Sequence, residues 1–369
     1  MKNYTRNKSG IDILVHVEDP GAINFLKELP TFLNQKGYSF IFICHGVAIK
    51  KFQSEEYFFR EKIEDPDLII NKLKPSLVIL GTSENPNSFA FPLIKSAKKS
   101  SIPTIGVIDC AINTRNRFRG NTADPIFYSP DELFVPDQKT KDEFSKLGFD
   151  QKNILITGNP IYQNALNFRE DTIASKQINR NLMESSTQKL KILFISESWD
   201  KLDPSASRKN VNYKLHGRGD SDFRTIIVME ELIDSLKRSD IEAQTSLRLH
   251  PNSSIEDFKP ISSEFDEISS ISDPYEDCLN CDLVIGISSM LLLEASLIGK
   301  PTLSIMPDLN EFHWMPNNYL GPTNVVSTRQ KLESYWKKRK FLEYEYSEQD
   351  WVPVDQIKKI MDRISELLE

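Results

Sequence analysis

The segment from Cys281 to Ile305 constrains the fold of this chain more than any other stretch. Residues 282–287 form a short apolar run that predicts a buried strand, and a two-serine turn follows it. Helical spacing begins at about Met290, and Gly-Lys-Pro then leads to a second apolar strand at 302–305. The segment therefore predicts a strand–helix–strand unit of a parallel sheet.

The turn in this unit is a candidate phosphate site. A helix that opens on Ser288 and Ser289 presents unpaired backbone N–H groups and the positive end of its dipole. Such a helix start binds anions, most often phosphate. Glu294 follows within the helix, where its carboxylate can reach a pair of ribose hydroxyls. The alternative is an ordinary strand–helix–strand unit with a serine cap and an exposed glutamate.

The same alternation of short apolar strands and helices runs through the rest of the chain. The other strands are predicted at 11–17, 39–44, 77–80, 104–108, 133–135, 154–156, 191–196, 245–249 and 267–270. Helices are predicted at 22–36, from about residue 85 to 99, at 226–237 and at 355–368. Continuous apolar strands that alternate with helices indicate parallel sheets covered on both faces, and hence an α/β fold.

Length and composition limit the number of domains, the kind of partner and the cellular location of the protein. The 369 residues predict two domains, which we place at 1–165 and 190–350, with a polar linker at 166–189 and a closing helix at 351–369. The net charge of −7 argues against nucleic-acid binding, and no apolar run is long enough for a transmembrane helix. The polar start lacks a signal peptide and there are four cysteines, so we expect a cytoplasmic protein with at most peripheral membrane contact.

Several kinds of enzyme site are missing from the sequence. No G-x-G-x-x-G follows the first strand and no G-x-x-x-x-G-K-[ST] occurs, which argues against a nicotinamide dehydrogenase and a P-loop enzyme. Cys278 and Cys281 form C-x-x-C without a second pair, so buried thiols explain them better than zinc. We expect neither a metal nor another cofactor.

Polar residues follow the predicted strands, where open α/β sheets bind their ligands. In the first half, Asp19, Glu84 and Asp109 are three candidates for a general base. Each has a plainer interpretation as a helix cap, a residue that complements a helix dipole or a strand-end residue. The sequence does not choose among the three.

Further residues that could contact a ligand lie beside these carboxylates: Gly21, Asn24, Asn85, Asn113, Arg115, Arg117 and Arg119. The three arginines alternate along one loop with no acid among them, a pattern that suits a phosphate or carboxylate group of a ligand. A solvated basic loop is the alternative. In the second half, the polar residues that follow strands are Ser196, Glu197, His250, Ser288, Ser289 and Glu294.

Two segments resemble a known superfamily. DLVIGISSMLLLEASLIGKPTLSI (282–305) resembles the nucleotide-sugar-binding element of GT-B-fold glycosyltransferases, UDP-sugar 2-epimerases and CDP-glycerol glycerophosphotransferases. DELFVPDQKTKDEFSKLGFDQKNILITGNPIYQ (131–163) resembles the end of the N-terminal domain in the same superfamily. The resemblance implies two Rossmann-like, doubly wound parallel-sheet domains that face a central cleft, with a C-terminal helix that crosses back to the first domain.

The resemblance also implies roles for single residues. It gives Ser288 and Ser289 to the donor diphosphate, Glu294 to the ribose and residues 299–301 to the return turn. The pair His250-Pro251 resembles a donor-phosphate contact of the glycerophosphotransferase group. With this resemblance, the polar residues of the second half, Ser196 and Glu197 included, are expected to bind the donor. The residues beside the three carboxylates of the first half, from Gly21 to Arg119, are expected to bind the acceptor.

The expected function is a metal-independent glycosyltransferase of surface polysaccharide biosynthesis. It would take a sugar from a nucleotide-sugar and pass it to a glycan or lipid-linked acceptor. Three alternatives stay open: a UDP-N-acetylhexosamine 2-epimerase, a CDP-alditol phosphotransferase, and a GT-B-like binding protein without catalysis. A single Glu294 in place of a paired-glutamate donor loop counts against the epimerase.

Overall fold

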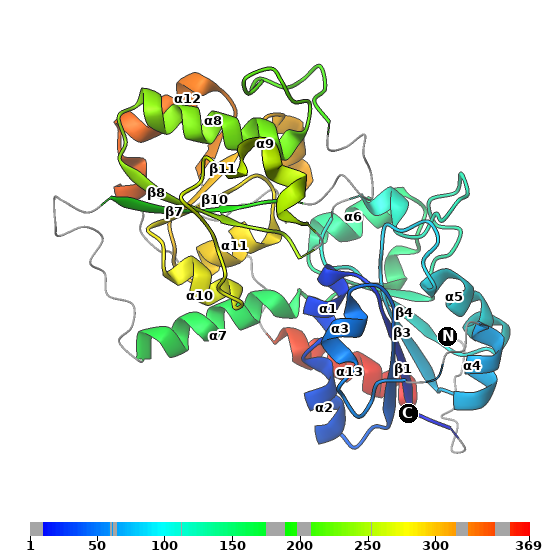
Figure 1. Ribbon diagram of the computed structural model, residues 1–369. Coiled ribbons are helices and arrows are strands. Elements are labelled where there is room, and N and C mark those ends of the chain that lie inside the picture. Colours follow the sequence, from blue (N-terminus) through cyan, green and yellow to red (C-terminus); the bar gives the residue numbers. More distant parts are fainter. Residues whose placement is uncertain are drawn as a thin grey trace. The chain divides into compact units, whose positions relative to one another are not determined.

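The computed structural model describes residues 10–59, 61, 65–111, 113–174, 189–197, 208–251, 253–314, 324–343 and 355–369. The chain divides into two compact units (Figure 1). The N-terminal unit combines residues 1–163 with 351–369, and the C-terminal unit holds 164–350. Each unit is an α/β structure built around one parallel sheet.

The sheet of the N-terminal unit has the order β2-β1-β3-β4-β5-β6 among the described residues, and all of its pairings are parallel. Its strands are β1 (Ile13–Val17), β2 (Phe40–Cys44), β3 (Leu77–Gly81), β4 (Thr104–Val107), β5 (Glu132–Val135) and β6 (Ile154–Ile156). The register places Ile13 beside both Phe40 and Leu77, so the carboxyl ends of β1, β2 and β3 meet at one edge of the sheet.

Helices cover both faces of this sheet. They are α1 (Pro20–Leu26), α2 (Leu29–Gln35), α3 (Ala48–Phe52), α4 (Pro66–Leu73), α5 (Ala90–Lys99), α6 (Gln138–Lys146) and α13 (Gln356–Leu368), with short 3-10 turns η1 (Thr114–Asn116) and η2 (Gln151–Asn153). Ile13, Val15 and Val17 share an apolar core with α1, α2 and α13, whereas Leu14 packs with α4 and α5 on the other face. This alternation is the one that a strand covered on both faces requires.

The single helix predicted at 22–36 is wrong, because the chain forms α1 and α2 instead. Pro30 lies in the first turn of α2. Within one continuous helix its ring would clash with the carbonyl of Leu26 and would remove a backbone hydrogen bond. At the start of a new helix, proline causes no such clash and removes no hydrogen bond, because the first N–H groups of a helix have no partner within it.

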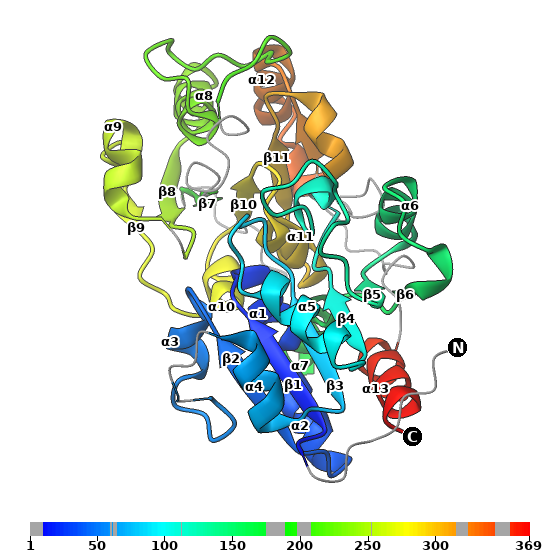
Figure 2. The same ribbon diagram turned by 90° about the vertical axis from the view of Figure 1, so that its right-hand side faces the viewer.

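The C-terminal helix belongs to the N-terminal unit, as the resemblance implied. α13 packs beside α2 and buries Ile360, Ile364 and Leu368 in the core of this unit (Figures 1 and 2). Arg363 on its polar face pairs with Glu132 of β5. Long-range packing therefore fixes the end of the chain to its beginning.

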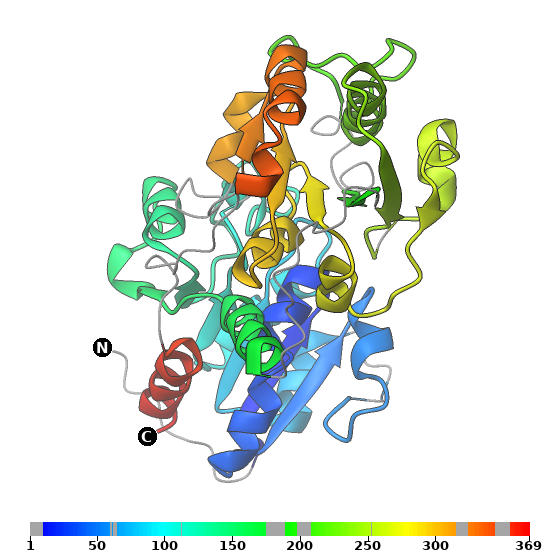
Figure 3. The ribbon, with the colours of Figure 1, turned by 90° about the vertical axis from the view of Figure 1, so that its left-hand side faces the viewer.

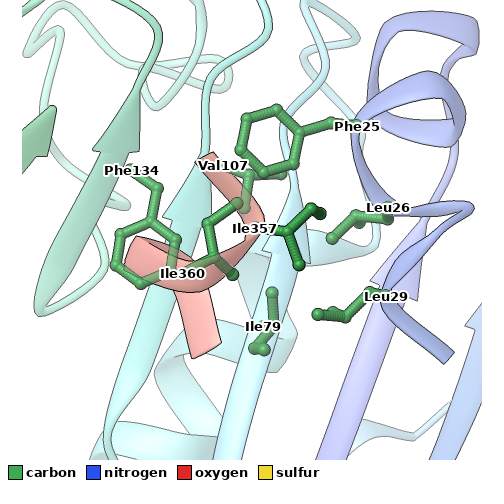
Figure 4. A pocket seen from close by; sticks show the side chains of 8 residues that line it. All are labelled: Phe25, Leu26, Leu29, Ile79, Val107, Phe134, Ile357 and Ile360. Atoms are coloured by element: carbon green, nitrogen blue, oxygen red, sulfur yellow. The ribbon is translucent and has the colours of Figure 1, made fainter. Parts of the chain in front are cut away.

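A small apolar cavity of about 10 Å³ remains under this helix (Figure 4). Its lining is entirely hydrophobic: Phe25, Leu26, Leu29, Ile79, Val107, Phe134, Ile357 and Ile360. It is about the size of one water molecule and offers no polar partner, so it is a packing defect and not a ligand site.

The sheet of the C-terminal unit has the order β12-β11-β10-β7-β8-β9 among the described residues, again with parallel pairings. Its strands are β7 (Leu190–Ile195), β8 (Ala243–Arg248), β9 (Glu267–Ile268), β10 (Leu283–Gly286), β11 (Thr302–Ile305) and β12 (Asn324–Val326). The short edge strand β12 was not predicted, because three residues carry too little pattern.

The helices of this unit also lie on both faces. They are α8 (Arg224–Arg238), α9 (Lys259–Ser262), α10 (Pro274–Leu279), α11 (Met290–Leu297) and α12 (Arg329–Lys337), with 3-10 turns η3 (Ile255–Phe258), η4 (Leu309–Trp314) and η6 (Lys340–Glu343). Figure 1 shows α8 and α12 on one side of the sheet and α10 and α11 on the other. Figure 3 shows α9 beside α8 at the β8–β9 edge.

The predicted linker at 166–189 begins inside a helix. α7 (Pro160–Ala174) includes residues 166–174, and residues 175–188 lie outside the described part of the chain. Among the described residues, no helix is long and apolar enough to span a membrane.

Candidate functional site

The carboxyl ends of β1, β3 and β4 bring the three predicted bases to one edge of the N-terminal sheet. Asp19 follows β1, Glu84 follows β3 and Asp109 follows β4. Gly21 allows this arrangement, because a Cβ at that position would lie 2.0 Å from Oδ2 of Asp109. The carboxylate of Asp109 therefore lies closest to Gly21 in the structure. From the sequence, a bound acceptor was predicted at that place.

A buried arginine joins two of these carboxylates. Nη2 of Arg117 lies 3.3 Å from Oδ1 of Asp109 and 3.9 Å from Oε1 of Glu84. The side-chain amide of Asn113 donates a hydrogen bond of 2.8 Å to the other oxygen of Glu84. We call Arg117, Asp109 and Glu84 the N-terminal cluster.

The loop with three arginines is therefore not uniformly solvated. Arg115 and Arg119 are exposed, whereas Arg117 is buried and turned toward the cluster. Burial lowers the pKa of Arg117, but Asp109, Cys110 and Glu84 raise it above its ordinary value, so the side chain stays charged. The charge of Arg117 is engaged with the protein's own acids, whereas Arg115 and Arg119 are exposed, so the three arginines differ in their access to an anion.

Asp19 differs from the other two candidates. Burial raises its pKa from 3.8 to about 6, and the negative charge of Glu18 adds to the effect, while a hydrogen bond from Ser83 and the charge of Arg117 oppose it. A carboxyl group in this range exchanges a proton near neutral pH, which general acid–base catalysis requires.

Glu18 carries its own hydrogen bonds. Asn85 donates to one carboxylate oxygen at 2.7 Å, and Ser88 donates to the other at 2.6 Å. Asn85 thus supports Glu18 in this structure. Asn24 lies half-buried within α1, close in sequence to Gly21.

A histidine pair at the same edge was missed by the sequence analysis. Nε2 of His16, within β1, lies 3.1 Å from Nδ1 of His45, which follows β2. The ring of Phe89 packs on His45 with 4.6 Å between centroids. The sequence did contain a signal for this pair. His16 is a polar residue inside an otherwise apolar strand, and His45 directly follows a neighbouring strand.

In the C-terminal unit, the helix predicted after the two serines begins as expected at Met290. Ser289 is the N-cap of α11, and its hydroxyl accepts a hydrogen bond of 3.3 Å from the backbone N–H of Leu291. This is the ordinary capping arrangement, and it supports the positive end of the helix dipole.

Ser288 is not open to a ligand in this structure. The carboxylate of Glu197 accepts a hydrogen bond of 2.6 Å from its backbone N–H. Nη2 of Arg224 donates to its hydroxyl at 3.1 Å. An internal carboxylate therefore takes one of the N–H groups that we predicted for a diphosphate, because β7 and β10 are neighbours and bring residue 197 beside residue 288.

Arg224 also holds a second acid. Its guanidinium pairs with Glu197 and with Glu311, and its Nε lies 2.9 Å from Oε2 of Glu311. The arginine side chain is 1% exposed, and each of the two glutamates is 4% exposed. We call Arg224, Glu197 and Glu311 the C-terminal cluster. Burial raises the pKa of Glu311, and the charge of Arg224 opposes that shift.

His250 lies beside this cluster at the end of β8. Its backbone N–H donates to the hydroxyl of Ser196 at 2.9 Å, and Ser196 itself is fully buried. Burial lowers the pKa of His250, although the charge of Glu197 opposes this. A neutral imidazole beside the strand ends can donate one hydrogen bond to a phosphate oxygen.

Glu294 is buried, contrary to the alternative of an exposed helix residue. It accepts a hydrogen bond of 2.8 Å from the hydroxyl of Tyr275 on α10. Burial raises the pKa of Tyr275, and the carboxylate of Glu294 adds to that shift, so the phenol remains a donor. Tyr275 thus fixes the orientation of the carboxylate predicted to bind ribose.

No metal site is apparent in the described part of the chain. No group of three or more His, Cys, Asp or Glu side chains there is arranged to hold an ion. The four cysteines are buried and are not joined in disulfides, and burial raises the pKa of Cys278 and of Cys281. Thiols in this state are structural.

Comparison with known proteins shows similarity in structure alone. No protein-family model matches the chain, and no curated protein matches its sequence. Solved structures do match. The Staphylococcus aureus MnaA structure with UDP superimposes with a TM-score of 0.64 and 13% identity, covering 96% of each chain.

Two further structures give the same result. UDP-GlcNAc 2-epimerase from Methanocaldococcus jannaschii, in complex with UDP-GlcNAc and UDP, matches with a TM-score of 0.61 and 14% identity over 96% of this chain and 99% of its own. A variant of the wall teichoic acid polymerase TagF matches with a TM-score of 0.54 and 14% identity over 96% and 88%. The protein has the GT-B fold.

The GT-B fold confirms the architecture that the sequence predicted: two Rossmann-like parallel sheets and a C-terminal helix that returns to the first unit. At sequence identities of 13–14%, the similarity shows that the fold is shared, but it does not show which reaction the protein catalyses. The assignment of single residues to donor, acceptor and base remains a prediction.

Proposed function

We propose that this GT-B protein is a metal-independent glycosyltransferase in which Asp19 acts as the general base. The observation that carries the proposal is the position of Asp19, directly after β1 at the carboxyl edge of the N-terminal sheet, where burial raises its pKa to about 6. A base with a pKa near the working pH is largely ionised at that pH and is still basic enough to accept a proton from the substrate.

Of the three candidate bases, Asp19 is the one that is suited to exchange a proton. Asp109 and Glu84 already share the buried cation of Arg117, and protonation of either would leave that charge less compensated. One carboxylate is enough to take the proton of an acceptor hydroxyl as that hydroxyl attacks the anomeric carbon. With the base in line, the configuration at that carbon would invert.

The C-terminal unit supports the donor side of the proposal. The start of α11, with Ser289 as its cap, and the neutral His250 offer hydrogen-bond donors for a leaving diphosphate, and these can replace a metal ion. Glu294, oriented by Tyr275, is the proposed ribose ligand. Structures with the same fold carry UDP or UDP-GlcNAc. We take the acceptor to be a glycan or a lipid-linked glycan.

The test combines nucleotide binding with turnover. The purified chain is incubated in EDTA with UDP-, GDP- and CDP-sugars and a panel of glycan acceptors, and nucleotide release is measured. We expect acceptor-dependent release that Asp19→Asn lowers by about 10²- to 10⁴-fold while nucleotide binding persists. Glu294→Ala should instead weaken nucleotide-sugar binding. Full turnover by Asp19→Asn would overturn the assignment of the base.

A UDP-N-acetylhexosamine 2-epimerase is the second candidate. It is favoured by the match to such enzymes over nearly the full length of both chains. Product formed from UDP-GlcNAc alone, without any acceptor, would favour it over glycosyl transfer. Including CDP-glycerol in the panel tests the phosphotransferase, and failure of every nucleotide to bind would point to the binding protein.

A further inference from the structure

The histidine pair of the N-terminal unit has a geometry that fixes where its protons lie. His16 is fully buried within β1, and its Nε2 faces Nδ1 of His45 at 3.1 Å. Burial and, to a smaller extent, the neighbouring His45 together lower the pKa of His16 to about 3. His16 is therefore neutral, with one N–H and one bare nitrogen.

The position of that single proton follows from a buried atom. Nδ1 of His16 is buried and has no hydrogen-bond partner among the described residues. A proton there would be an N–H without an acceptor, which costs more than a bare lone pair. The proton of His16 thus belongs on Nε2, where it is donated to Nδ1 of His45.

The arrangement determines the state of His45 in turn. Because its Nδ1 accepts a hydrogen bond, a neutral His45 carries its proton on Nε2, the nitrogen directed away from His16. A second proton on His45 would place an N–H against the N–H of His16. His45 is held as a neutral donor, and it is not suited to exchange protons as an acid or base.

His45 lies at the edge of the sheet where the candidate base is found. It follows β2, the strand beside β1, and β1 ends at Glu18 and Asp19. The backbone of its neighbour Gly46 comes close to Glu18, with 3.3 Å between the position of a Cβ and the carbonyl oxygen of Glu18. His45 is half-buried, and among the described residues its ring has a hydrogen bond only to His16.

We propose that His45 is a substrate-binding residue of the N-terminal site, with His16 as the residue that positions it. The Nε2–H of His45 donates a hydrogen bond to the oxygen of a sugar hydroxyl, and the neighbouring carboxylate of Glu18 accepts from a hydroxyl of the same sugar. A fixed neutral donor beside an acceptor matches hydroxyl groups, which both accept and donate. The identification of the ligand as a sugar rests on the proposed function, whereas the tautomer does not.

The first measurement needs no substrate. Long-range ¹H–¹⁵N correlation spectra of the ¹⁵N-histidine-labelled chain report which ring nitrogen of each histidine carries a proton. His16→Gln and His45→Gln assign the two sets of signals. Burial lowers the pKa of His45, although the charge of Glu18 opposes this. We therefore expect the neutral form of His45 to carry its proton on Nε2 and to gain a second proton only below the ordinary histidine pKa of about 6.5. A proton on Nδ1, or ordinary titration, overturns the proposal.

The second measurement adds methyl glycosides of N-acetylglucosamine and galactose as probes. We expect the Nε2 signal of His45 to shift, and His45→Phe to weaken binding of the probe about tenfold, as loss of one hydrogen bond predicts. His45→Gln should recover part of the affinity, because its amide can donate. His216→Gln, at an exposed histidine of the other unit, is the control.

The outcomes separate the two proposals. Signals of His45 that no probe moves overturn its role in binding. Probe binding through His45 without any transfer from a nucleotide-sugar supports the role of His45 and contradicts the glycosyltransferase.

Discussion

Each unit of the molecule holds one buried arginine between two carboxylates beyond the ends of its strands, but the two clusters differ in access to water. The acids of the C-terminal cluster are 4% exposed, whereas Asp109 and Glu84 of the N-terminal cluster are 18% exposed. The C-terminal cluster also takes the N–H of Ser288. The N-terminal cluster lies near an additional acid, Asp19, with a pKa of about 6.

The comparison teaches that similar charges in the two sheets serve different purposes. A closed set of buried charges, with hydrogen bonds satisfied, fixes the positions of strand ends and helix starts. A partly open set beside a raised pKa is suited to chemistry. We therefore infer that the C-terminal cluster is mainly structural and that the N-terminal cluster lies at the reacting end.

The largest expected effect comes from removing the cation of the C-terminal cluster. Arg224→Met would leave Glu197 and Glu311 buried without their partner, and should lower the free energy of unfolding by about 3–5 kcal/mol. Arg238→Met, in the same helix but with a side chain that is 39% exposed, should cost less than about 1 kcal/mol. Urea unfolding of both variants measures the difference, and equal losses would contradict the structural role.

The same change in the N-terminal cluster should cost less. Arg117→Met is expected to lower the free energy of unfolding by about 2–3 kcal/mol, because water can reach the acids that remain. Arg115→Met, two residues away and exposed, should change it by less than about 0.5 kcal/mol. If Arg117→Met lowers the free energy of unfolding as much as Arg224→Met does, the two clusters do not differ in the way that we infer.

Asp19→Asn, the variant expected to lower turnover, should at the same time stabilise the protein. The native state binds the proton of Asp19 more tightly than the unfolded state, since burial raises the pKa from 3.8 to about 6. The stability of the wild-type chain therefore falls as the pH rises from about 4 to about 6. The stability of the variant does not fall in this way, because asparagine has no carboxyl group to ionise. Above this window we expect a gain of about 2 kcal/mol, which disappears near pH 4.

Unfolding at several pH values measures the effect at Asp19. Asp67→Asn is the matched control with the opposite sign, because hydrogen bonds from Ser96 and Lys99 lower the pKa of Asp67. A variant at Asp19 that is less stable than the wild type at pH 7 would show that the carboxylate is structural.

The smallest effect concerns the orientation of Glu294. Tyr275→Phe removes one hydrogen bond of 2.8 Å and should cost about 1 kcal/mol of stability. Tyr335→Phe is the control, because the hydroxyl of Tyr335 is buried without a partner among the described residues, so its removal should be neutral or stabilising. Thermal unfolding compares the two, and an equal cost would argue against the role of Tyr275.

Much of the fold was predictable from the sequence, because strand and helix periodicity are local properties. The predicted strand at 302–305 and the helix start at Met290 agree with β11 and α11. The helix at 22–36 was predicted wrongly, since its apolar spacing continues across the break before Pro30. Periodicity reports which residues face the core, and it does not report whether the backbone is continuous.

The candidate site was predictable as a set of residues but not as a set of contacts. The sequence placed Asp19, Glu84 and Asp109 after strands, and it also placed Arg117 in the loop that follows Asp109. It did not show that Arg117 turns inward to both Asp109 and Glu84, or that His16 and His45 form a pair. Those contacts depend on which strands are neighbours.

The sequence by itself thus determined the class of fold, the approximate strands and helices, and the positions at which chemistry can occur. Only the tertiary structure decided how the charges pair: Glu197 and Ser288 lie 91 residues apart and meet because β7 lies beside β10. Ionisation and hydrogen bonding respond to neighbours within a few ångströms. Sheet order sets those neighbours, and it is decided by packing across the whole unit.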